Sequence, residues 1–322
     1  MTRTIFWNDN EHRVRFFWRL AVYALLLAIL TAVFSVLLSP SVTAAGVIEY
    51  TRPSTFLSTG GASLVATAIA TAVTAPLLDR RPIKDYGLRF NGAWWRDFGF
   101  GLALGAGLMS VIFVVEWAAG WITIAGTLQS GGTGSFAMAF LFVVGGFLCI
   151  GIYEEVAFRG FGLTNVAEWL HRFGPISARS AVVAATLLTA LLFGALHAMN
   201  PNAGVISTVN IVIAGATLLS LGLLLTGELA IPIGVHITWN LFQAAIFGFP
   251  VSGLDLGTTV VAVEQGGPTW LTGGAFGPEA GVLGLVAMLA GSRLTVLWVR
   301  WTRGKVALAH GIAEPPRGEK IT

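Results

Sequence analysis

The chain has 322 residues, of which 55% are hydrophobic and only 11% are charged. A soluble globular domain usually carries about 25% charged residues, so the composition excludes a soluble protein. The net charge is only +3 and the Lys and Arg residues lie between apolar segments, which argues against a nucleic-acid-binding face. Cys149 is the only cysteine, which excludes an intramolecular disulfide and a cysteine metal site.

Eight apolar segments approach or exceed the roughly 20 residues that a helix needs to cross a bilayer. In chain order they are Phe16–Leu38, Phe56–Leu78, Phe98–Trp121, Ser135–Leu163, Arg179–Ala198, Gly204–Leu225, Pro232–Phe249 and Ala280–Trp301. Long stretches of alternating polar and apolar residues are absent, which argues against an outer-membrane barrel. The sequence therefore predicts an all-α, polytopic membrane helix bundle with about eight transmembrane helices.

The distribution of basic residues predicts how this bundle is oriented. With the N-terminus inside, Arg52 is the only basic residue in the outer segments. The inner segments hold Arg3, Arg13, Arg15, Arg19, Arg80, Arg81, Lys84, Arg89, Arg96, Arg172, Arg179, Arg300, Arg303, Lys305, Arg317 and Lys320. Cytoplasmic loops are enriched in Lys and Arg. We therefore expect both termini inside, and a location in the cytoplasmic membrane of a prokaryote.

We expect one integral membrane domain with three parts. Residues 1–134 hold helices 1–3 and a basic cytoplasmic loop, residues 135–249 hold helices 4–7 as a catalytic core, and residues 250–322 hold an outer Gly-rich loop, helix 8 and a cytoplasmic tail. The Gly-rich loop indicates a solvated, turn-rich connection, with a lid over a site as the alternative. Gly101 and Gly105 form a GxxxG pair that predicts close helix packing, and the tail from Glu314 onwards is expected to be disordered.

Ionisable residues within the apolar segments are the candidates for function, because such groups are costly in lipid. In the fourth segment, Glu155 and Arg159 are four residues apart and can pair on one helix face. Glu154 is rotated by about 100° from Glu155, so the same arginine does not easily serve it. A carboxylate without a full charge partner can act as a general base.

Two further pairs follow the same spacing. Phe193 and His197 end the fifth segment, and His236 and Asn240 begin the seventh. A lone histidine in an apolar helix is more often structural than catalytic, and Asn240 alone indicates helix packing. Two histidines together with an unpaired glutamate favour a functional site inside the bundle.

The three patterns EExxxR, FxxxH and HxxxN, in this order and in separate segments, resemble the motifs of the CPBP intramembrane proteases. That family includes the type II CAAX prenyl endopeptidases and the proteins similar to lysostaphin-resistance protein A. The resemblance covers roughly residues 135–249, a third of the chain. It implies an intramembrane endopeptidase that acts on a membrane-associated polypeptide, such as a prenylated CAAX-type protein, and no nucleic-acid partner.

The resemblance also implies roles for the residues. Glu154 and His197 activate a water for attack on a peptide carbonyl, and His236 and Asn240 bind the developing oxyanion. The supporting residues that hold the site in shape are Glu155, Arg159 and Phe193.

Zinc is the only cofactor that these residues suggest, with Glu154, His197 and His236 as its ligands. The HExxH pattern of zinc proteases is absent, and a mechanism centred on a glutamate needs no metal. We therefore favour an enzyme with no obligatory metal.

Segment edges alone place His197 about 25 Å from the inner edge of the bundle, whereas Glu154 and His236 lie in the inner half. The site can form only if the fifth segment is shifted in register, steeply tilted or re-entrant. Two other functions stay open: a proton-coupled transporter, for which inverted repeats are expected but not found, and a non-catalytic immunity or partner-binding membrane protein.

Overall fold

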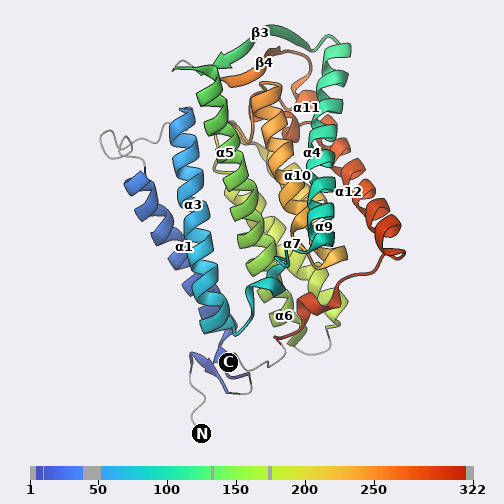
Figure 1. Cartoon of the computed structure of the whole chain (residues 1–322). Coiled ribbons are helices and arrows are strands. Elements are labelled where there is room, and N and C mark those ends of the chain that lie inside the picture. Colours follow the sequence, from blue (N-terminus) through green and yellow to red (C-terminus); the bar gives the residue numbers. More distant parts are fainter. Residues whose placement is uncertain (1–4, 10, 39–51, 132–133, 173–175, 317–322) are drawn as a thin grey trace.

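The chain folds into a bundle of long helices with a two-stranded sheet across one end (Figure 1). The structure is a computed structural model that describes residues 5–9, 11–38, 52–131, 134–172 and 176–316. Its α-helices are α1 (Phe16–Leu38), α3 (Pro53–Thr74), α4 (Gly92–Ala118), α5 (Phe136–Glu154), α6 (Thr164–Arg172), α7 (Ala178–His197), α8 (Val205–Ala216), α9 (Leu218–Thr226), α10 (Ala230–Leu241), α11 (Thr269–Thr272) and α12 (Val282–Arg303).

Shorter elements connect and extend these helices. Three have π-helical geometry: η1 (Ala75–Asp79), η3 (Glu155–Leu163) and η4 (Phe242–Ile246). Four are short 3-10 helices: η2 (Ile83–Tyr86), η5 (Gly274–Phe276), η6 (Pro278–Ala280) and η7 (His310–Ala313). The strands β1 (Trp7–Asn8) and β2 (Arg13–Val14) form one antiparallel pair, and β3 (Ile122–Ser130) and β4 (Thr258–Gln265) form another.

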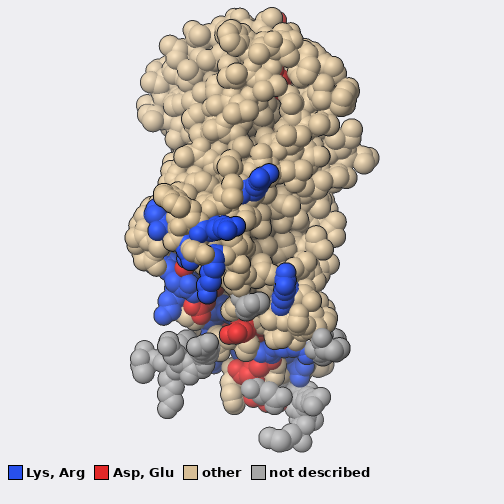
Figure 2. Space-filling view, turned by 90° about the vertical axis from the view of Figure 1, so that its right-hand side faces the viewer, with Lys and Arg blue, Asp and Glu red and all other residues tan. Residues whose placement is uncertain are grey.

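The predicted membrane bundle is confirmed. Within the described residues, seven helical segments are long and apolar enough to cross a bilayer, and an eighth, Ala230–Ile246, is shorter. Helix α1 begins and α12 ends on the side away from the β3–β4 sheet (Figure 1), and the basic residues gather in the lower half of the face shown in Figure 2. Both observations agree with the predicted orientation. Arg3, Arg317, Lys320 and most of the predicted tail lie outside the described residues.

Glycines bring α10 into close contact with two neighbouring helices. A Cβ atom on Gly101 would lie 2.5 Å from the carbonyl oxygen of Ile231, and one on Gly105 would lie 2.5 Å from that of Val235. The predicted close packing of the GxxxG pair is therefore confirmed, with α10 as the partner. On the other side, a Cβ on Gly151 of α5 would lie 2.5 Å from Cγ1 of Ile237. Only glycine allows α5 and α10 to approach this closely.

The Gly-rich connection is folded and not the solvated, turn-rich segment that we expected. We call residues 250–281 the outer cap. Its strand β4 pairs with β3 from Ile122↔Gln265 to Ser130↔Thr258. Phe276 and Glu279 are buried. The Asn210 amide of α8 donates hydrogen bonds to the backbone oxygens of Glu279 and Gly281, at 3.0 and 3.1 Å. The expectation was wrong because these contacts join segments that are distant in the sequence.

A buried ion cluster holds the inner end of α1 against the rest of the bundle. Arg13 Nη1 lies 2.7 Å from Asp79 Oδ1, and Arg19 pairs with the same carboxylate. Arg81 Nη2 lies 2.8 Å from Glu168 Oε2. All five side chains are buried. Because buried charges are tolerated only when paired, this cluster fixes how the N-terminal segment, η1 and α6 meet.

Candidate active site

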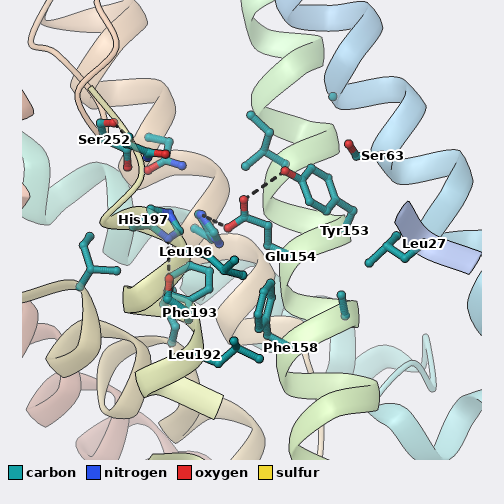
Figure 3. A pocket seen from close by; sticks show the side chains of 18 of the residues that line it. Leu27, Ser63, Tyr153, Glu154, Phe158, Leu192, Phe193, Leu196, His197 and Ser252 are labelled. Atoms are coloured by element: carbon teal, nitrogen blue, oxygen red, sulfur yellow. Dashed lines mark hydrogen bonds and ion pairs between the residues drawn. The ribbon is translucent and has the colours of Figure 1, made fainter. Parts of the chain in front are cut away.

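One large cavity of about 1360 Å³ lies inside the bundle, and the predicted catalytic residues all line it. Glu154 comes from the end of α5, His197 from the end of α7, and His236 and Asn240 from α10. The outer cap contributes the part of the lining that includes Ser252 (Figure 3). The structure therefore brings together four residues that are separated by up to 86 positions in the sequence.

The predicted mismatch in depth between Glu154 and His197 is absent, because the fourth helix is longer than the apolar segment predicts. It does not end at Leu163 but continues through η3 and α6 to Arg172. From Arg172 back to Glu154 the chain climbs about 27 Å, and from Ala178 to His197 it climbs about 28 Å. The two residues therefore reach a similar height. None of the tilted or re-entrant arrangements is needed.

Glu155 holds His236 in place. Nδ1 of His236 lies 2.7 Å from Oε1 of Glu155, and Nη1 of Arg159 lies 3.0 Å from the same oxygen. The side chains of Glu155 and Arg159 are 0% and 2% exposed. The predicted pairing of Glu155 with Arg159 is confirmed. Because a carboxylate oxygen accepts, Nδ1 of His236 carries a proton and its Nε2 is the nitrogen left for other partners.

Glu154 has one oxygen engaged and one without a hydrogen bond. The Tyr153 hydroxyl donates to Oε1 of Glu154 at 3.1 Å (Figure 3). Oε2 is buried and has no hydrogen-bond partner among the described residues. It lies 3.8 Å from Nε2 of His236, which is too long for a direct hydrogen bond. A gap of this length between two polar atoms is suited to a bridging water.

His197 is oriented by the backbone of its own helix. Its Nδ1 lies 2.8 Å from the carbonyl oxygen of Phe193 (Figure 3). A carbonyl only accepts, so Nδ1 carries the proton and Nε2 of the neutral ring has a free lone pair. The guanidinium of Arg159 lies over the Phe193 ring, 4.2 Å from its centroid. Arg159 thus contacts the groups that orient both histidines.

Asn240 follows His236 by one helical turn and lines the same cavity. Within the described part of the chain its side chain makes no hydrogen bond, so its amide is free to meet a ligand there. The π-helical segments η3 and η4 begin at Glu155 and at Phe242, close to the site residues. Such segments occur frequently at functional sites, because the extra residue per turn redirects side chains.

The geometry does not fit the predicted zinc ligands. Among the described residues, no group of three or more His, Cys, Asp or Glu side chains could hold a metal ion. Glu154, His197 and His236 share the cavity but do not form such a group. Both histidines also use Nδ1 for protein oxygens. The arrangement gives no support for a metalloprotease.

Several residues of the site region escaped the sequence analysis. Tyr153 directly precedes Glu154, and its phenol next to a buried carboxylate was the one available signal. Ser252 and Glu279 line the outer end of the cavity, where the backbone N–H of Ser252 donates to Oε1 of Glu279 at 2.5 Å. Gln243 donates to the other oxygen. Burial raises the pKa of Glu279 to about 7. The Gly-rich sequence around Glu279 gave no sign of this burial.

Comparison with known families agrees with this geometry. Residues 136–242 match the family described as type II CAAX prenyl endopeptidase Rce1-like. This part of the chain is an Rce1-like domain. The matched region runs from the start of α5 to the beginning of η4 and contains every site residue that the motifs predicted. The Rce1-like domain supports the CPBP family of membrane proteases and, in general, a CAAX-type intramembrane endopeptidase. No curated protein and no solved structure matches the chain.

Proposed function

We propose that this chain is an endopeptidase that hydrolyses a peptide bond of a membrane-associated polypeptide inside the central cavity. The observation that carries the proposal is the free Oε2 of Glu154, which faces Nε2 of His236 across 3.8 Å in a cavity that His197 also lines. A carboxylate oxygen with no protein donor, beside two oriented imidazoles, is the arrangement that a general base for water needs.

In the proposed reaction, a water binds at Oε2 of Glu154 and within reach of His197. Glu154 accepts a proton as the water oxygen attacks the carbonyl carbon of the substrate. The C–N bond then breaks, and the proton passes to the leaving amine. Nε2 of His197, which its Phe193 hydrogen bond leaves free, accepts a hydrogen bond from the water and aligns it for attack.

His236 and Asn240 are proposed to bind the oxyanion. To donate through Nε2, His236 has to carry protons on both ring nitrogens, since Nδ1–H is already bound to Glu155. The Glu155 carboxylate stabilises that imidazolium, as the buried aspartate does in a Ser-His-Asp triad. With Glu154 and Glu155 ionised and Arg159 and His236 protonated, the four groups sum to zero charge. Net neutrality favours such a cluster in a low-dielectric bundle.

The walls of the cavity favour a substrate with an apolar chain. Leu27 of α1, Phe158 of η3, and Leu192 and Leu196 of α7 line it beside the polar site residues (Figure 3). Such walls suit a polypeptide segment that carries a lipid or lies in the membrane. A prenylated CAAX-type C-terminus is the proposed substrate class, in line with the Rce1-like domain.

The test uses the full chain in proteoliposomes with a farnesylated C-terminal peptide as the probe. We expect cleavage by the wild type and a loss of at least 100-fold in Glu154→Gln, which keeps the size of the side chain but removes the base. Glu116→Gln is the matched control, because Glu116 is a buried glutamate that does not line the cavity. Its cleavage rate should equal that of the wild type.

A parallel measurement identifies the natural substrate. Peptides released in membranes that contain the wild type are compared by mass spectrometry with those from membranes that contain Glu154→Gln. If neither experiment shows cleavage that depends on Glu154, the protease function is wrong, and a non-catalytic partner-binding protein becomes the better description. If only natural membranes show it, the prenylated substrate class is wrong.

A further inference from the structure

Helix α12 carries a charged residue in the middle of its membrane-spanning segment, on the outside of the bundle. Arg293 lies eleven residues after Val282 and ten before Arg303, the two ends of the helix. Its side chain is exposed. Among the described residues it has neither a hydrogen bond nor an ion pair. By contrast, Arg159, the basic residue in the active site, is buried and paired with Glu155. Arg293 therefore has no function in the active site and no partner in its own bundle.

The position of Arg293 makes direct contact with water or lipid phosphates unfavourable. Arg300, on the same side of α12, lies seven residues or about 10 Å closer to the inner end. Trp298 and Trp301 flank Arg300, and tryptophans of this kind mark the membrane–water interface. The Cα–Cβ bond of a helical residue tilts towards the N-terminus of its helix. In α12 that end is the outer one, so the Arg293 side chain leaves the backbone in the direction away from the inner interface.

We propose that this face of α12 binds a transmembrane helix of another membrane protein, and that this helix carries an Asp or Glu side chain at the depth of Arg293. Around Arg293 the same face exposes apolar side chains one and two turns away, including Val286, Leu289 and Leu297. An apolar stripe with one central cation complements an apolar helix with one central carboxylate. Charged residues in membrane helices pair in this way because an unpaired charge is expensive in lipid.

A second copy of this chain is a poor partner for this face. In a two-fold symmetric dimer through α12, one Arg293 would face the Arg293 of the other copy. A different arrangement would need an acidic residue on the outside of the bundle. Within the described spans, Asp79, Asp97, Glu116, Glu155 and Glu168 are all 0% exposed, and Glu154 faces the cavity. The face of the molecule that lies to the right in Figure 1 shows the same contrast, since its visible acidic side chains gather towards the lower end (Figure 2).

The experiment uses the full chain in phosphatidylcholine liposomes and a synthetic Leu/Ala-rich transmembrane peptide with one central Glu. Binding is measured by energy transfer between a dye on the peptide and a dye on α12. We expect the Glu peptide to bind the wild type at least tenfold more tightly than it binds Arg293→Leu, and at least tenfold more tightly than a Leu peptide binds the wild type. The charge-reversed pair, Arg293→Glu with a Lys peptide, should restore binding.

Arg300→Leu is the matched control, because it removes a basic residue from the same side of α12 at the interface and should leave binding unchanged. The melting temperature of Arg293→Leu should equal or exceed that of the wild type, since the substitution removes an unpaired charge. Equal binding of Glu and Leu peptides would overturn the proposal. So would energy transfer between two labelled copies that depends on Arg293, or an Arg293-dependent enrichment of phosphatidylglycerol around α12 with no preference for the Glu peptide.

Discussion

Gly151 provides a quantitative test of how the active site is assembled, because it sets the distance between α5 and α10. In Gly151→Ala, the new Cβ would lie 2.5 Å from Cγ1 of Ile237, whereas ordinary contacts of this kind measure 3.4–4 Å. The two helices would have to separate by about 1 Å, a displacement that can cost about 100-fold in rate when it misplaces catalytic groups. Glu155 and His236 lie on the two helices that separate, so we expect cleavage to fall by one to two orders of magnitude. Overpacking of this size costs about 1–3 kcal/mol of stability.

A second substitution makes this expectation specific. Ile237→Ala removes the closest atom, after which the nearest neighbour of the new Cβ is the backbone nitrogen of Ile237 at 3.0 Å. The required separation then falls to about 0.5 Å, so the double variant should regain much of the lost rate. Gly61→Ala is the control, because a Cβ there would meet nothing within 4 Å. The assay is the initial rate of cleavage in proteoliposomes, with melting temperatures measured in parallel. Wild-type activity in Gly151→Ala, or no recovery in the double variant, would refute the reasoning.

Three further predictions concern the surroundings of the site. Arg159→Lys keeps the charge but loses the planar group that contacts Glu155 and covers the Phe193 ring; because that ring contact can contribute about 2 kcal/mol, the rate should fall by up to about 30-fold with little change in substrate affinity. The pKa of Glu279 is raised to about 7 from its ordinary 4.5, so the native state holds this proton more tightly than the unfolded state does. The stabilisation should therefore be complete below about pH 4.5 and be lost as the pH rises through 7, which hydrogen exchange of residues 250–281 at pH 5.5 and pH 8 would show, and Glu279→Gln should remove the difference. Zinc chelation should leave cleavage unchanged, since Glu154, His197 and His236 do not form a metal-binding group, and a loss of activity that added zinc restores would contradict this.

Much of the bundle could be predicted because membrane-spanning helices leave a strong signal in the sequence. The length of each apolar segment gave the positions of the helices, and for Phe16–Leu38 it also gave the ends. The spacing of Glu155 and Arg159 predicted their pairing correctly, because four residues make one helical turn. The residues that line the cavity could be selected since an ionisable side chain in an apolar helix has few reasons to be there.

The remaining features depend on contacts between distant segments or on details of helix geometry. Helix α6 is short and polar, so its apolar length gave no reason to extend the fourth helix beyond Leu163, and the depth of His197 was misjudged. The burial of Glu279 depends on Ser252 and Gln243, which the sequence does not place beside it. The Gly-rich outer cap has no periodicity that would indicate a strand, and β4 forms because β3 lies beside it.

The equal climb from Arg172 to Glu154 and from Ala178 to His197 makes these two antiparallel arms a ruler. Both catalytic side chains stand at the same mark, about 27 Å above the turn that joins α6 and α7. A substrate is then selected by how deep its cleavable bond lies as well as by the side chains around that bond. A change of one residue in either arm would move one side chain by 1.5 Å and rotate it by 100°, so the two arms can change length only together and by whole turns.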